Sequence, residues 1–416
     1  MNSALAAPIS LLLSIFLIIK KTSPVYSLII GAVTGGLLAG WGIETTVAEM
    51  IAGVKDITPA IVRIIAAGVL TGMLVKTGAA TTIAKSIINA LGKRYIYLAI
   101  ALSAMILTAM GVFIDVAVIT IAPIAVIAGS KLKLSRMKLL LAMVGGGKCG
   151  NIISPNPNTI IAAENFDAPL SYVMGAGIIP ALIGLAVTIF IILPMMPKRD
   201  MLVDDESAKE NDEQLPSLLR SLIGPVITIA LLALRPVAGI VIDPMIALPV
   251  GGFVGIIATG HWKSAAECLS YGLGKMSTIA ILLVGTGTLA GIIKASSIKD
   301  VLVDMLAGWS NGGTFMVPIS SALMSAATAS TTAGATIASA SFGDAIIAAG
   351  VATVWGAAMV NSGATVLDHL PHGSFFHATG GSMGMDVKER LKLIPYETLV
   401  GFVLAMGTVF TYMLIG

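Results

Sequence analysis

The chain has 416 residues, of which 56% are apolar and 11% are charged, and its mean hydropathy is +0.96. Too few polar residues are present to cover a soluble globule of this size, so the composition excludes that class and predicts an integral membrane protein in contact with the lipid bilayer. The net charge of +3 says little about partners, and no nucleic-acid partner is predicted. Few aromatic residues and no alternating segments favour transmembrane helices over barrel strands.

Apolar runs between charged residues predict the crossings of the first half. In chain order they are 3–19, 24–42, 58–75, 138–163 and 173–195. Residues 79–92 mix apolar and polar positions at helical spacing, which predicts an interfacial helix. If the basic residues near 20, 93, 131–138 and 198 face the cytoplasm, residues 95–130 must enter and leave on one side, so we expect a re-entrant hairpin with its tip near Gly111.

The second half repeats this arrangement. Residues 197–216 form a hydrophilic stretch that predicts a cytoplasmic linker. The crossings expected after it are 217–235, 243–260, 276–293, 351–378 and 394–415, with a second hairpin at 313–350. Glycines recur at a fixed offset of 219 residues, as in Gly36 and Gly255, Gly53 and Gly272, Gly68 and Gly287, and Gly72 and Gly291.

Five crossings per repeat would place the second copy upside down in the membrane. The charges agree, since Glu164 and Asp167 precede the last crossing of the first half, whereas Lys388, Arg390 and Lys392 precede that of the second. The predicted fold is therefore an all-α polytopic protein with two inverted-topology repeats, 1–196 and 217–416. Each holds about five transmembrane helices, a re-entrant hairpin and a broken helix, and both termini face the periplasm.

Polar residues inside apolar segments are candidates for function. Asp115 follows the expected tip of the first hairpin. A carboxyl group in apolar surroundings favours its neutral form, so Asp115 is a candidate proton carrier. The alternative is a structural carboxylate held by backbone amides at the tip.

The segment 145–159 interrupts a predicted crossing with glycines, asparagines and two prolines, which a continuous helix does not tolerate. Freed backbone groups and the start of the following half-helix can hold an anion, so Asn156, Asn158 and Thr159 are candidate substrate ligands. Lys148 is a candidate counter-ion for a substrate carboxylate, with a structural ion pair or an interfacial position equally open. The glycines lack the spacing of a phosphate loop, and no cofactor is predicted.

The second hairpin tip carries Ser330, Thr331 and Thr332, hydroxyl groups that either bind substrate or join membrane helices. The segment 361–374 again combines a proline and glycines with polar residues, which predicts a second broken helix. Its candidate substrate ligands are Asn361 and Ser374, and its candidate proton carriers are Asp368 and His372, with His369 as another histidine that can titrate. Pro371 and Gly373 break any common helical face between these groups, so no metal site is predicted.

Taken in order, these clusters resemble the gluconate:proton symporter (GntP) family of the ion transporter superfamily. Residues 113–116 with 121–123 are similar to its Phe-Phe-Asp hairpin, 154–157 to its Pro-Pro-His-Pro-Gly-Pro break, 332–338 to its Gly-Ser-Ala-Thr-Val-Ala tip, and 373–376 to its Asn-Asp-Ser-Gly-Phe-Trp segment. The resemblance implies an elevator-type carrier, commonly dimeric, that takes up gluconate-like sugar acids with protons. Asn156 stands where the family motif has histidine, which indicates a different acid or a different coupling ion.

The sequence therefore predicts a secondary active importer in the bacterial inner membrane, a homodimer that takes a sugar acid or a shorter hydroxy-carboxylate such as glycerate. Protons are the expected coupling ion and sodium is the alternative. A channel and an intramembrane enzyme are less favoured, because the sequence shows no catalytic dyad and its broken helices are typical of carriers.

Overall fold

The computed structural model describes residues 3–197, 215–297 and 312–416. These residues form helices joined by short connections, with no strand in the described ranges. The predicted all-α class is therefore confirmed for this part of the chain. Most of the predicted linker, residues 198–214, lies outside the described residues.

The helices of the first half follow the predicted order closely. They are α1 (Ser3–Ile19), α2 (Pro24–Leu38), α3 (Ile43–Lys76), α4 (Ala79–Leu91), the 3-10 turn η1 (Lys93–Tyr95), α5 (Ile96–Ala109), α6 (Ile114–Leu132), α7 (Arg136–Asn151), α8 (Pro157–Asn165), α9 (Leu170–Ala176), α10 (Ile178–Val187), the π-helical segment η2 (Thr188–Ile192) and α11 (Leu193–Met195).

The second half runs through a similar series of long and short helices. They are α12 (Leu218–Ala238), α13 (Pro244–Ala258), the 3-10 turn η4 (Trp262–Ser264), α14 (Ala265–Ala295), α16 (Gly312–Thr328), α17 (Thr331–Ala348), α18 (Thr353–Gly363), α19 (Ser374–Ser382), α20 (Val387–Leu391) and α21 (Ile394–Ile415).

Six helical stretches of the described chain are long and apolar enough to cross a membrane, or seven if the bent pair α4 and η1–α5 counts as one span. That pair bends by 106°. Three further apolar helices, near α1, α2 and α13, are shorter. By length and composition the chain is thus a multi-pass membrane protein, and the ten crossings expected from the sequence stay a prediction.

Two long helices, α3 and α14, begin earlier than predicted. The sequence placed their crossings at 58–75 and 276–293, whereas the helices start at Ile43 and Ala265. The predicted spans were ended at charged residues such as Glu49, Lys55 and Lys275, but the helices continue through these residues. With 34 residues at about 1.5 Å each, α3 is longer than the hydrocarbon core of about 30 Å, so its charged part extends beyond the core.

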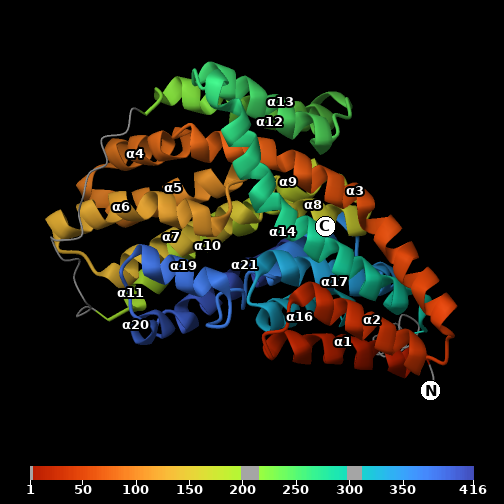
Figure 1. Cartoon of the computed structure of the whole chain (residues 1–416). Helices are drawn as coiled ribbons and strands as arrows, with labels where there is room; N and C mark the ends of the chain where they lie inside the picture. Colours follow the sequence, from red (N-terminus) through yellow and green to blue (C-terminus); the bar gives the residue numbers. More distant parts are fainter. Residues whose placement is uncertain (1–2, 198–214, 298–311) are drawn as a thin grey trace.

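Glycines bring α3 and α14 into close antiparallel contact. A side-chain carbon on Gly53 would clash with the backbone of Gly287, and one on Gly68 or Gly72 would clash with the backbone of Gly272 or Cys268. Contacts therefore run in opposite directions along the two helices. In Figure 1 this pair lies between α1 and α2 on one side and the helices α4–α7 and α19–α21 on the other.

Several helices begin at side-chain caps, and two of these caps lie at the predicted site. Asn156 accepts a hydrogen bond from the amide of Thr159 at the start of α8, and Pro157 occupies the first position of that helix. Ser330 accepts from the amide of Ala333 at the start of α17. These caps satisfy amides that the first turn leaves unpaired, and they fix where each half-helix begins.

Candidate functional site

Both predicted hairpins consist of two helices joined by a tight turn. The first turn lies between α5 and α6, where Gly111 has a φ of +98°, a left-handed conformation that favours glycine. The second lies between α16 and α17, where Ala329 has a φ of +46°. Both helix interruptions are also present, from Asn151 to Pro157 and from Gly363 to Ser374. Whether the hairpins are re-entrant in a membrane stays a prediction.

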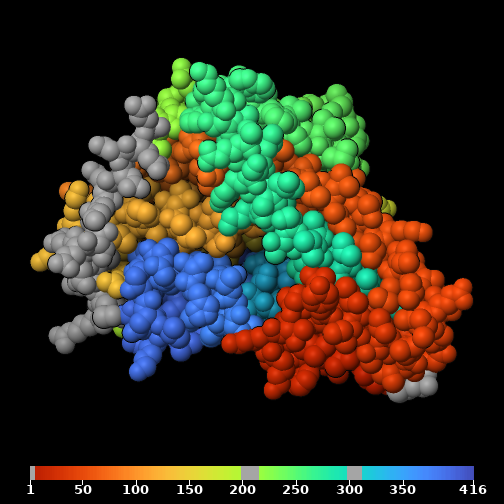
Figure 2. Space-filling model, in the orientation of Figure 1, coloured from red at the N-terminus to blue at the C-terminus, as the bar shows by residue number. Residues whose placement is uncertain are grey.

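The two tips and the two interruptions line one cavity of about 890 Å³. Its remaining wall comes from α14 and the start of α2. Figure 2 shows the hollow between the blue C-terminal part, the red N-terminal part and the green-to-teal surface of α14. Seven of the twelve site residues predicted from the sequence line it: Asp115, Asn158, Ser330, Thr331, Thr332, Asp368 and Ser374.

Three further predicted residues are buried behind this wall and hold the interruptions together. Asn158 donates a 2.7 Å hydrogen bond to Asn361, and Asn361 donates a 2.9 Å bond to the hydroxyl of Thr159. Asn156 caps α8 and also donates to the side chain of Asn151. The amides of Asn156 and Asn361 are therefore occupied by protein partners, while Asn158 also reaches the cavity.

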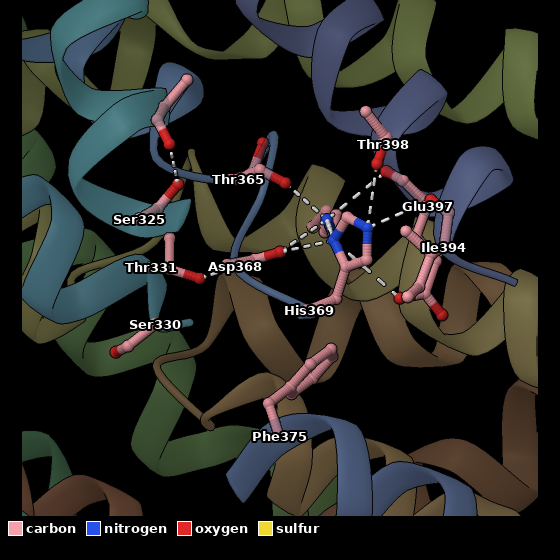
Figure 3. Close-up of polar contacts among 12 residues, drawn as sticks. Ser325, Ser330, Thr331, Thr365, Asp368, His369, Phe375, Ile394, Glu397 and Thr398 are labelled. Atoms are coloured by element: carbon pink, nitrogen blue, oxygen red, sulfur yellow. Dashed lines mark hydrogen bonds and ion pairs between the residues drawn. The ribbon is translucent and has the colours of Figure 1, made fainter. Parts of the chain in front are cut away.

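Lys148 is fully buried, and its ammonium group is bound by the second interruption. It donates a 2.7 Å hydrogen bond to Oδ1 of Asp368 and another to the carbonyl of Thr365, and it lies 3.1 Å from Nδ1 of His369. Oδ2 of Asp368 accepts a 2.6 Å bond from Thr331 at the second hairpin tip. Asp368 therefore lies between Lys148 and the cavity, and it provides the pairing that a buried cation requires (Figure 3).

A second buried ion pair lies next to the first. Arg390 donates a 3.0 Å bond to Oε2 of Glu397, and a second contact between the two side chains measures 2.7 Å. The guanidinium group also contacts Thr379 and the ring of Phe376 on α19. From the sequence Arg390 was one of three cations before the last crossing. The structure keeps it there, in α20 before α21, but buries its side chain to 1% exposure, which the sequence did not indicate. The lone acid Glu397 in an apolar span was the signal for this pair.

The two histidines considered in the second interruption differ in their surroundings. His369 is buried, and its Nε2 lies 3.1 Å from both the carbonyl of Ile394 and the hydroxyl of Thr398. His372 is exposed and lies 3.3 Å from the carbonyl of Ala327, outside the buried network. Across the described residues, no group of three or more His, Cys, Asp or Glu side chains is arranged to hold a metal ion.

Comparison with known proteins identifies the family. The sequence model of the GntP family permeases matches residues 3–415. The chain belongs to the GntP permease family. Over 404 residues it is 50% identical to an uncharacterized transporter of Haemophilus influenzae, covering 97% of this chain and 96% of that protein. It is 24% identical over 311 residues to the high-affinity gluconate transporter of Escherichia coli, covering 69% and 68% of the two chains.

A solved structure supports the architecture. The YdaH transporter of Alcanivorax borkumensis, described as having an unusual topology, superposes with a TM-score of 0.60 at 14% identity, over 90% of this chain and 89% of that one. At this identity the likeness concerns the fold alone. The family resemblance seen in the sequence motifs is thus confirmed, and the chain is a membrane transporter rather than an enzyme.

The structure adds a cavity cation to the permease site that the sequence did not indicate. Lys275 of α14 is half-buried and is the one lysine or arginine among the described residues that line the cavity. Its ammonium group lies 5.9 Å from the ring centroid of Tyr271. It immediately precedes the predicted span 276–293 and was not among the predicted site residues. If the helical pattern of this span is extended back to Ala265, Lys275 falls on the face of α14 that lines the cavity.

Proposed function

We propose that this permease is a secondary active importer of a small hydroxy-carboxylate, either a gluconate-like sugar acid or a shorter acid such as glycerate, in the bacterial inner membrane. The observation that carries the proposal is the single cavity lined by two hairpin tips and two interrupted helices. Carriers bind their substrates at such half-helix ends, where unpaired backbone groups are available. The relative that transports gluconate supports the substrate class.

The polar side chains of the cavity suit a hydroxy acid. Thr331, Thr332, Ser330 and Ser374 offer hydroxyl groups that both donate and accept hydrogen bonds. The start of α17 lies beside them, and the N-terminus of a helix favours a carboxylate. We assign to Lys275 the contact with the substrate carboxylate from the wall of α14. Lys148 then acts behind Asp368, and Asn156, Thr159 and Asn361 keep the first interruption in shape.

Proton coupling belongs to the same proposal. Asp115 is half-buried on the cavity wall, and Asp368 joins the cavity to the buried charges. His372 is exposed to solvent nearby. Asp115 and Asp368 can each take a proton from the cavity as the anion enters, and His372 can take one from solvent. Sodium is the second candidate ion, because the asparagine and threonine oxygens at the first interruption are ligand types that suit sodium.

We further propose two inverted repeats, an elevator-type motion and a homodimer. In the repeat with an offset of 219 residues, Gly53 corresponds to Gly272, and Gly68 corresponds to Gly287. The structure contains both the contact between Gly53 and Gly287 and the equivalent contact between Gly272 and Gly68. A twofold axis perpendicular to α3 and α14 accounts for this pairing. If these helices cross the membrane, such an axis lies in the membrane plane, as an inverted repeat requires.

Transport by purified protein in proteoliposomes tests the function. We expect saturable uptake of radiolabelled gluconate or glycerate, counterflow by unlabelled substrate, and accumulation driven by an inward proton gradient. Accumulation driven by a sodium gradient at constant pH would select sodium instead. Flux that does not saturate and shows no counterflow would indicate a channel, and absence of transport for both classes of acid would reject the proposal.

A further inference from the structure

We propose that the coupling proton resides on His369, delivered through Asp368, and that one proton accompanies each monocarboxylate without net charge transfer. This inference rests on the proposed carboxylate transport. It names a residue that lies behind the cavity wall and is 0% exposed, so it differs from the cavity-lining candidates.

The first argument is the charge balance of the buried cluster. Lys148 and Arg390 carry two positive charges, and Asp368 and Glu397 carry two negative charges, so the four groups are neutral together when His369 is neutral. The other two charged side chains that line the cavity, Lys275 and Asp115, cancel each other. An incoming carboxylate therefore adds one negative charge that no group in the cavity balances. A proton on His369 restores neutrality, which matters because unpaired charge is costly in a low-dielectric interior.

The second argument is the hydrogen bonding of the imidazole ring. Nε2 lies 3.1 Å from the carbonyl of Ile394, which only accepts, so Nε2 carries the hydrogen in the neutral ring. Nδ1 then accepts from the ammonium group of Lys148 at 3.1 Å. It also lies 3.1 Å from Oδ1 of Asp368. In the neutral ring this is a contact between two acceptors, and a proton on Nδ1 turns it into a hydrogen bond.

The third argument is access. Asp368 lines the cavity, and its two oxygens face different partners: Oδ2 meets Thr331 at the hairpin tip, whereas Oδ1 meets His369 and Lys148. A proton taken by this carboxylate can pass to Nδ1. The O–H bond then breaks as the N–H bond forms, and Asp368 becomes a carboxylate again. Figure 3 shows Asp368 between Thr331 and the ring of His369.

Charged groups face the ring from each element packed against it. Lys148 on α7 opposes it, Asp368 next to it in the chain favours it, and Oε2 of Glu397 on α21 lies 4.0 Å from Nδ1 and favours it too. Arg390 on α20 is held by Glu397. Protonation therefore breaks the bond from Lys148 to Nδ1 and leaves the ammonium group with its other acceptors, Oδ1 of Asp368 and the carbonyl of Thr365.

The test compares His369→Gln with wild type in proteoliposomes supplied with labelled gluconate and, separately, glycerate. Gln keeps a donor for the carbonyl of Ile394 and takes no proton. We expect counterflow to persist, whereas accumulation under an inward proton gradient falls to the equilibrium level. For one proton per anion, wild type should reach about tenfold accumulation per pH unit. His261→Gln, in the connection between α13 and α14, is the matched control and should behave as wild type.

Three results would overturn the inference. Gradient-driven accumulation by His369→Gln at the wild-type level removes His369 as the proton acceptor, and its loss in His372→Gln alone transfers the role to that residue. A membrane potential set with potassium and valinomycin should not alter wild-type uptake, so a strong response rejects neutral coupling. This last measurement tests the one-to-one neutral coupling even if His369→Gln fails to fold. If wild type transports neither acid, the proposed function itself fails, which is a separate outcome.

Discussion

Lys148 and Asp368 form an ion pair that is almost completely enclosed, with side-chain exposures of 0% and 3%. From the sequence, Lys148 was as compatible with a structural pair as with a substrate counter-ion. The choice depended on a partner 220 residues away, which local patterns do not reveal. The unusual position of a lysine within an apolar segment was evident from the sequence, whereas its partner required the fold.

Removing one member of this pair should be costly. Lys148→Met leaves the carboxylate of Asp368 without its buried cation, and loss of one partner in a buried pair typically costs about 3–5 kcal/mol. We expect a clear fall in the melting temperature of the purified protein by scanning fluorimetry. Lys294→Met is the matched control, because its pair with Asp56 is exposed and screened by water. Similar melting temperatures for both variants would contradict the assignment.

Asp243 provides a pH-dependent test at the N-cap of α13, directly before the apolar helix begins. Its carboxylate accepts hydrogen bonds from Nε of Arg63, at 3.1 and 3.2 Å, and from Nη2, at 2.8 Å. The guanidinium group holds the pKa of Asp243 below its ordinary value of 3.8. Because the folded pKa is lowered, this contribution to stability is fully present above the unfolded pKa and is lost as the pH falls from there through the lower folded pKa. The melting temperature of Asp243→Asn should fall less steeply with acidification than that of wild type. Parallel curves would show that the pair contributes nothing.

At the scale of elements, the interruptions were predictable and the helix lengths were not. Prolines and glycines inside apolar runs remove backbone donors or permit turns, so the breaks before Pro157 and Ser374 follow from local chemistry. Helix α3 continues through charged residues to Ile43 because ionisable side chains stop a membrane crossing without stopping a helix. Extending the helical pattern past those charges would have corrected both long helices.

The glycine contacts between α3 and α14 predict a position-specific cost. Gly72→Ala and Gly272→Ala each place a carbon against backbone atoms of the partner helix, and overpacking of this kind costs about 1–3 kcal/mol. Gly274→Ala, on the same α14, meets no atom within 4 Å and should be neutral or stabilising, since alanine favours a helix over glycine. Melting temperatures of the three variants check this. Equal effects at 272 and 274 would contradict close packing.

At the scale of the whole molecule, the inverted arrangement depends on sidedness. Of the three cations before the last crossing, Arg390 is buried in an ion pair, whereas Lys388 and Lys392 are exposed. On the other half, Glu164 pairs with Arg63, and Asp167 is exposed. The exposed lysines and Asp167 therefore still support opposite orientations of the two repeats by the positive-inside rule. The pairing of glycines across α3 and α14 gives independent support, which the sequence offered only as a numerical offset.

Cysteine labelling tests the sidedness directly. We expect Asp167→Cys to react with an impermeant maleimide from the periplasmic side and Lys388→Cys from the cytoplasmic side. Both native cysteines, Cys149 and Cys268, are buried, so wild-type protein should stay unlabelled without further substitution. Labelling of both positions from one side would rule out the inverted repeat.

The cavity wall contributed by α14 bears on the design of inhibitors. Thr331 and Ser374 belong to the hairpin tip and the second interruption, whereas Lys275, which we assign to the substrate carboxylate, belongs to the long helix on the other wall of the cavity. In an elevator-type cycle these surfaces slide past each other. A carboxylic acid with an additional rigid group that binds both surfaces would compete with the substrate for the cavity. It would also prevent the two surfaces from moving and hold the carrier in this conformation.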